Sequence, residues 1–134
     1  MANLVQVEAT SMLNASFGRI TFPAPTTPMM LRLMSTNGSS TAAGTEVANS
    51  GGSTYAPQNM STAALANASA GVLTTSGGAL SFTNMPAITT TGVEVWDSTG
   101  TPVRKWFGAL TASKTTGLGD TLSFAASSIT ATLG

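Results

Sequence analysis

The sequence predicts a mainly β fold, an antiparallel β-sandwich or barrel-like domain with one short N-terminal helix. Its second half consists of short segments in which apolar and hydroxyl residues alternate, separated by glycine, asparagine and serine turns. Alternation with a period of two puts apolar side chains on one face of a strand and hydroxyls on the other. Many such segments with turns between them are typical of a sandwich or barrel. The 134 residues suit a single domain, 1–134, with an N-terminal helix and extended arm over 1–28 and a β domain over 29–134.

The helix is expected over residues 4–17. Asn3 is a candidate N-cap with Gln6 three residues later, and Gly18 is a candidate stop signal. Apolar residues then recur at helical spacing, namely Val5, Ala9, Met12 and Leu13. Residues 21–28 hold three of the six prolines and are expected to form an extended connector.

Residues 29–35, MMLRLMS, are expected to form the first strand of the β domain. Met30, Arg32 and Met34 fall on one face and the other apolar residues on the opposite face, which predicts burial on both sides. Residues 36–54 are nearly all small and polar and predict a long surface loop, interrupted by a short extended TEV. Loops of this length are usually functional or mobile. A further strand is expected from Tyr55, and Pro57 places it at a sheet edge.

Six more short strands are expected at 71–75, 79–83, 87–97, 102–112, 121–125 and 129–133. The clearest hairpin is GVEVWDSTGTPVRKWFG, in which Trp96 and Trp106 are expected to pair across the strands. In the last two strands the inward-facing residues are expected to be Leu122, Phe124, Ile129, Ala131 and Leu133. Asp120 is expected to close the preceding turn with its side chain.

Charged residues make up only 7% of the chain, against a usual value of about 25%. Five acidic and five basic residues give a net charge of zero, although soluble proteins usually keep their net charge away from zero. Two interpretations remain open: a surface solvated by serine and threonine, or a surface that meets other protein. Nucleic acid is not an expected partner, because Arg104 and Lys105 form the only adjacent basic pair. No apolar run approaches a membrane span, and the N-terminus lacks the pattern of a secretion signal.

Histidine and cysteine are both absent from the chain. Their absence removes the usual general base, the usual metal ligands and the common nucleophile pairs. Of the five carboxylates, Glu94 and Asp97 are close in sequence but would face opposite sides of a strand. We therefore predict no catalytic, cofactor-binding or metal-ligating residue, and no enzyme activity. Met29, Met30 and Met34 could form either core or an adaptable binding surface, and core is the favoured interpretation.

Several segments carry a resemblance to a known family: LNASFG, PAPTTPMMLRLMST, FTNMPA, GVEVWD and WFGALTASKTTGLGDTLSFAASSITATL. Together they resemble a family of small bacteriophage virion proteins, often labelled tail fibre protein, some of which are similar to capsid decoration proteins. The likeness covers nearly the whole chain and is most specific in its C-terminal segment. The chain departs from the pattern at Arg104-Lys105 and at Gly117-Leu118. Both departures are expected to lie on the surface and to leave the fold unchanged.

The resemblance implies a non-enzymatic structural protein of the virion that is assembled in the host cytoplasm and uses no cofactor. One location is the capsid exterior, as a decoration or cement protein that binds the major capsid protein and stabilises the shell. There it would act as a homo-oligomer, with a trimer as one arrangement. The alternative is a minor tail or tail fibre component that binds tail proteins and takes part in host attachment. The lack of heptads or repeats for a fibre shaft favours the capsid.

The expected contact regions are the loop 36–54 and the segment before Pro23. Ordering a flexible segment against a partner costs about 1–2 kcal/mol of backbone entropy per residue, so apolar anchors are needed. The nearest candidates are Leu4, Val5, Phe17, Met29 and Met30. Because so few ion pairs are available, we expect attachment to depend only weakly on salt.

Overall fold

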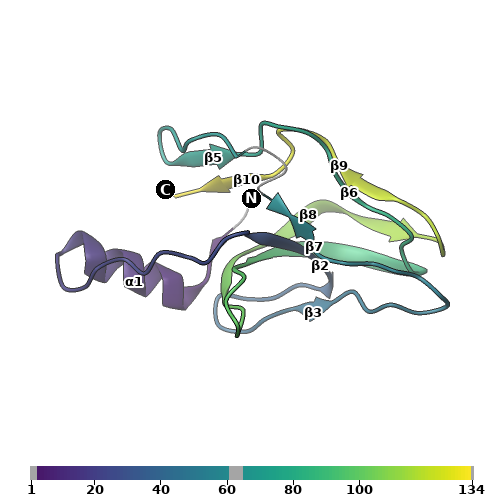
Figure 1. Cartoon of the computed structure of the whole chain (residues 1–134), viewed down its shortest axis with the longest axis horizontal. Coiled ribbons are helices and arrows are strands. Elements are labelled where there is room, and N and C mark those ends of the chain that lie inside the picture. The colour runs from purple at the N-terminus through teal and green to yellow at the C-terminus, as the bar shows by residue number, and fades with distance from the viewer. Residues whose placement is uncertain (1–2, 61–64, 134) are drawn as a thin grey trace.

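The computed structural model describes residues 3–60 and 65–133 and shows antiparallel sheets with one short helix near the N-terminus (Figure 1). The predicted fold class is confirmed, although the sheets do not close into a barrel. The elements are, in order, β1 (Asn3–Leu4), α1 (Gln6–Ser16), β2 (Met30–Thr36), β3 (Thr45–Glu46), β4 (Gln58–Asn59), β5 (Val72–Thr74), β6 (Leu80–Phe82), β7 (Ile88–Trp96), β8 (Arg104–Thr116), β9 (Leu122–Phe124) and β10 (Thr130–Thr132). Each strand predicted after residue 70 has a counterpart, and β8 runs four residues beyond its predicted end.

The main sheet has the strand order β1-β8-β7-β2-β3, and β4 pairs with β2 as well. The predicted hairpin is the β7–β8 pair at its centre. The predicted pairing of the two tryptophans is wrong: Trp96 lies opposite Arg104, and Trp106 lies opposite Val95. An irregularity in register between positions 95 and 96 shifts the pairing. Because successive side chains alternate between faces, the two indoles lie on opposite faces of the sheet.

A second layer covers one face of this sheet and consists of two short ladders, β6–β9 and β5–β10 (Figure 1). The core lies between the layers. It contains Leu31, Leu33, Val47, Tyr55, Met60, Leu80, Phe82, Met85 and Leu122. The ring of Phe82 is fully buried, stacks on Tyr55 at 5.8 Å and meets Phe124 edge-on at 6.2 Å. The methionine at position 34 is also buried, as expected for a packing residue.

The outer edge of β2 shows why Tyr55 is buried although it carries a hydroxyl. Strands β3 and β4 each pair with part of this edge and leave Leu33 between them. The Tyr55 hydroxyl fills the gap, accepting a 2.9 Å hydrogen bond from the Leu33 amide and donating one of 3.1 Å to Glu46. Burial is the main reason that the pKa of Tyr55 lies well above its usual value. The buried backbone amide thus obtains a partner that no strand supplies.

The helix and the end of the chain differ from expectation in three details. Val5, not Asn3, is the N-cap of α1, and no side chain caps the helix. The helix does not bury the apolar stripe predicted for it: within α1 only Glu8 is buried, and Leu13 is 61% exposed. Leu133, predicted to face inward, is 46% exposed, whereas Leu122 is buried as predicted. The Asp120 carboxylate accepts the Gly117 amide at 2.6 Å and closes its turn, as predicted.

Candidate functional site

Most of the charge in this protein is turned inward. Of its ten charged residues, seven take part in ion pairs, namely Glu8, Arg32, Glu46, Glu94, Asp97, Arg104 and Lys105. The remaining three, Arg19, Lys114 and Asp120, are exposed. The prediction that Arg104 and Lys105 lie on the surface is wrong, because their side chains are only 9% and 10% exposed. The outer surface is therefore even less charged than the composition indicates.

One buried cluster fixes the first part of the loop 36–54 against the main sheet. The Glu94 carboxylate accepts hydrogen bonds from Arg104 at 2.9 Å, from the Gly44 amide at 2.8 Å and from the Trp96 indole at 3.0 Å. Arg104 also donates to the Ala42 carbonyl at 2.6 Å. A Cβ atom at Gly38 would collide with Glu94 and Arg104, so the loop approaches this closely only with glycine at that position.

A second cluster joins the N-terminal segment to the body. The Lys105 ammonium lies 3.0 Å from Glu8 of α1 and 3.8 Å from Asp97, which follows β7. Burial would raise the pKa of Asp97, but hydrogen bonds from the Val103 amide and from Thr99, with the nearby Lys105 charge, together lower it. The Val5 amide donates to the Lys105 carbonyl at 3.1 Å. Glu94 and Asp97, although close in sequence, thus belong to separate ion pairs.

The N-terminal arm, which we define as residues 6–27, exposes large apolar side chains and buries almost none. Figure 1 shows α1 extending beyond the stacked sheets. Residues 16–27 are all exposed. Ten large hydrophobic residues are exposed in the part of the chain that the structure describes, and half of them belong to this arm: Val7, Leu13, Phe17, Ile20 and Phe22. The arm is held to the body at its two ends, by the Glu8–Lys105 pair and by the Ser98 amide, which donates to Thr26 at 3.0 Å.

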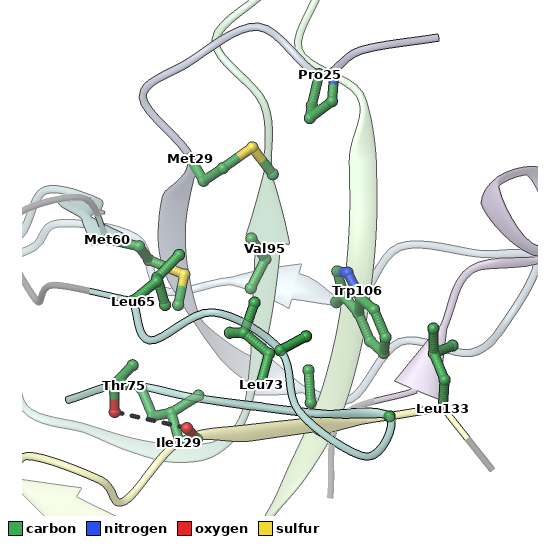
Figure 2. Close-up of a pocket in the computed structure, with 13 residues that line it drawn as sticks. Pro25, Met29, Met60, Leu65, Leu73, Thr75, Val95, Trp106, Ile129 and Leu133 are labelled. Carbon is green, nitrogen blue, oxygen red and sulfur yellow. Dashed lines mark hydrogen bonds between the residues drawn. The ribbon is translucent and has the colours of Figure 1, made fainter. Parts of the chain in front are cut away.

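A cavity of about 290 Å³ lies between the main sheet and the β5–β10 ladder. Figure 2 shows Met29, Val95 and Trp106 on the side of the main sheet and Leu73 and Ile129 on the side of the ladder. No charged residue lines it, and its one side-chain hydroxyl, on Thr75, lies 3.5 Å from the Ile129 carbonyl. The volume approaches that of small-molecule sites, but the few placed polar groups that orient such ligands are lacking.

The cavity is continuous with the apolar side of the arm. Leu133 lines the cavity and also a shallow groove formed with Leu4, Met12, Leu13 and Phe22. Leu65 and Leu133, two more of the exposed large hydrophobics, stand at the cavity wall. The arm and the cavity therefore adjoin at Leu133, and Arg19 is the one exposed charge among residues 6–27.

The predicted apolar anchors are only partly available for contact. Phe17 is 77% exposed, but Val5 is buried in its own chain at 4%. Leu4, Met29 and Met30 are half-buried. The loop 36–54, the other predicted contact region, presents a polar surface and turns Val47 into the core. Ile20 and Phe22 are also exposed but were not among the predicted anchors. Both lie in or next to the predicted extended connector 21–28.

Chemical features of a reactive site are sparse. Within residues 3–60 and 65–133, no three aspartate or glutamate side chains lie together in a way that could hold a metal ion. Over the same ranges, no helix has the length and apolar character needed to cross a membrane. All five carboxylates contact a cation or close a turn.

The fold and this surface define a small, mainly β protein with an exposed apolar arm and internal ion pairs. A family model described as Podophage GP4 fiber I protein gp80 matches residues 3–132, and the chain belongs to this family. It is therefore a structural protein of a bacteriophage virion, and the resemblance noted in the sequence is confirmed. Among curated proteins, none matches the chain.

Proposed function

We propose that this protein is a non-enzymatic component of a fibre on the virion, and that apolar contacts of its N-terminal arm hold it there. The observation that carries the proposal is the arm itself, in which Phe17 is 77% and Val7 71% exposed. An 11-residue helix is marginally stable on its own in water, and α1 buries only Glu8 in its own chain. A partner that covers the arm supplies the missing burial. The family description supports the fibre as the location.

The capsid exterior is the second candidate location, and one observation favours it. The body is a compact pair of layers, and the chain has no heptads or repeats from which a shaft could form. In this arrangement the protein is a decoration, or cement, protein that binds the major capsid protein through the same arm and stabilises the shell. In the first arrangement the partners are tail or fibre proteins. Both arrangements use homo-oligomers, because virion interfaces repeat around symmetry axes.

The proposal that the protein has no enzyme activity is supported by the state of its carboxylates. Each of the five is held by a lysine or arginine or by a turn amide, and histidine and cysteine are absent. A general acid or base needs a carboxyl that is free to exchange its proton with a bound substrate. Assays of the purified chain for hydrolysis of glycan and peptide substrates are expected to give background rates.

The location is tested by labelling the protein in intact virions and imaging the label. A fibre component places the label on appendages, and particles that lack the protein adsorb poorly to cells while their shells resist heat normally. A decoration protein places the label over the shell, and particles that lack it break at lower temperature or under osmotic shock. A protein that is absent from purified particles would overturn both arrangements.

Attachment is expected to be only weakly sensitive to salt, because the arm carries a single exposed charge, Arg19. Rebinding to particles that lack the protein is measured at low salt and at about 0.5 M salt, where the screening length is only a few ångström. Similar binding at both concentrations is the expected result. A collapse of binding at high salt would contradict apolar attachment, whichever location is correct.

A further inference from the structure

Seven of the ten exposed large hydrophobics in the described residues lie either on the N-terminal arm or at the cavity wall. Every copy of the chain therefore carries two adjoining apolar features of different shape. One is a protruding arm whose large apolar side chains are exposed. The other is a concave cavity of about 290 Å³ that the side chains of residues 3–60 and 65–133 leave open. The two features complement each other in shape and in polarity.

The arm has the features of a segment that inserts into a partner, and we call it the donor. At the end of α1 the amides of Phe17, Gly18 and Arg19 donate to helix carbonyls, and the next backbone hydrogen bond of the arm is the one that Thr26 accepts from Ser98. Phe17, the C-cap of α1, and Ile20 lie at the start of the exposed stretch 17–27. Ordering such a segment costs about 1–2 kcal/mol of backbone entropy per residue, and burial of aromatic side chains is the strongest stabilising contribution available to offset that cost.

The cavity has the features of a site that receives such a segment, and we call it the acceptor. Its wall is formed by Trp106 and Val95 of the main sheet and by Leu73 of the ladder. Neither the cavity wall nor the exposed apolar side of the arm brings in a charged group other than Arg19. Contact between them would therefore desolvate no charge apart from Arg19, which lies between Phe17 and Ile20 and whose long side chain can keep its guanidinium in water.

We propose that the arm of one copy inserts its apolar side chains, with Phe17 and Ile20 as the anchors, into the cavity between the main sheet and the β5–β10 ladder of a second copy. The inference rests on the proposed function, since it states how copies of the protein associate within the virion. Donor and acceptor are different surfaces, so the contact is head-to-tail and extends into a ring or an open filament. A chain without heptads can build an elongated assembly in this way.

The arm supplies most of the surface that one side of such a contact needs. A stable interface buries about 800 Å² on each partner with roughly 20–30 residues a side. The whole protein exposes 7153 Å², so the requirement is about a tenth of its surface. The arm contributes six exposed residues within α1 and eleven more over 17–27. A membrane surface is a less suitable occupant, because a membrane-binding helix normally carries several lysines or arginines on its polar face.

The test uses two variants of the full chain with opposite defects. The donor-deficient variant carries Phe17→Ser and Ile20→Ser, both at exposed positions. The acceptor-deficient variant carries Ala68→Trp, which fills the cavity from an exposed wall position, and Ala66→Trp outside the wall is its matched control. A second acceptor-deficient variant, Ala131→Phe, fills the same cavity from another wall position and should weaken association in the same way. Circular dichroism and thermal unfolding confirm that each variant folds.

Sedimentation velocity over rising concentration is the measurement. The parent chain and Ala66→Trp are expected to form species larger than dimers, whereas each deficient variant associates about 30-fold more weakly or worse, as for loss of an aromatic hot spot. An equimolar mixture of donor- and acceptor-deficient chains is expected to form a dimer that does not grow. A mixture that stays monomeric, or a parent chain that is monomeric at high concentration, would overturn the inference.

The result also separates this inference from the proposed function. A chain that does not self-associate but is found on virions retains the proposed function and loses the head-to-tail contact. A chain that self-associates as described but is absent from virions retains the contact and loses the function.

Discussion

In the β body, Glu94 is 1% exposed and holds Arg104 at 2.9 Å, whereas in the N-terminal arm Phe17 is 77% exposed. A soluble protein usually has its charges outside and its aromatics inside. The body departs from this arrangement by burying charges, and the arm departs from it by exposing an aromatic side chain. The body uses its few charges to fix loops and to join elements. The arm leaves its apolar side chains at the surface, where only another protein can cover them.

The low charge content and the burial of most charges leave the outer surface nearly uncharged. With three exposed charged residues, copies of the chain can approach closely without like-charge repulsion. The same property would make a free monomer prone to association. A repeated structural assembly benefits from that property, because each contact adds to the next.

The largest expected effect comes from breaking the central ion pair of the body. Glu94→Ala leaves the buried Arg104 guanidinium without its carboxylate and removes the acceptor for the Gly44 amide and the Trp96 indole. Loss of one partner of a buried pair costs about 3–5 kcal/mol. Urea unfolding should show a reduction of this size.

The matched control is Lys114→Ala, an exposed charge on β8, for which a change within about 0.5 kcal/mol is expected. Equal stability losses in the two variants would show that the inward charges do not hold the body together. The body and the arm would then differ in where their charges lie, but the buried ion pairs would not contribute to the free energy of unfolding.

The second prediction compares one phenylalanine from each region. Phe82→Ala removes a fully buried ring between Tyr55 and Phe124 and should cost about 3–5 kcal/mol of unfolding free energy. Phe17→Ala removes a ring that is 77% exposed and should change the stability of the monomer by less than about 0.5 kcal/mol. Thermal unfolding at a concentration too low for association is the suitable measurement. A large loss for Phe17→Ala would place the arm within the cooperative unit of the body.

The third prediction concerns Tyr55 and has a dependence on pH. Tyr55→Phe leaves the Leu33 amide without a partner and should cost about 1–3 kcal/mol near neutral pH. Because the folded state raises the pKa of this hydroxyl, its contribution is complete below the ordinary value of 10.0 and is lost as pH rises above it. The difference between parent and variant in urea unfolding should therefore shrink above pH 10. A difference that stays constant or grows there would contradict the role given to the hydroxyl.

Much of the fold could be predicted from the sequence because β strands with one buried face have a visible signature. Leu122 alternates with exposed neighbours, and the TEV segment stands out within a small polar loop; both lie in strands or beside the core. The pairing of Trp96 with Arg104 could not be predicted. A single irregularity in register changes which residues face each other, and no local pattern marked it.

The candidate surface could be predicted only in part, for a related reason. The adjacent pair Arg104 and Lys105 resembles a solvated surface site in sequence, and its burial depends on partners 10 and 97 residues away. The arm shows the opposite error: Leu13 has helical spacing with other apolar residues and yet remains exposed. Spacing identifies a helix face with an apolar stripe, but it does not identify the molecule against which that stripe packs.

The smallest expected effect comes from the junction between the two regions. Glu8→Gln keeps the shape of the side chain but removes the charge that faces Lys105 at 3.0 Å. Lys105 retains Asp97 at 3.8 Å, so its ammonium is not left alone, and the body should lose only about 1 kcal/mol. The arm should lose more, because its helix buries no other residue in the described chain. We expect a weaker helical signal in circular dichroism and faster proteolysis within residues 6–27, with Gln6→Ala on the exposed side of the same helix unaffected. If the proteolysis rate in the arm does not change, interactions other than this ion pair hold the helix against the body.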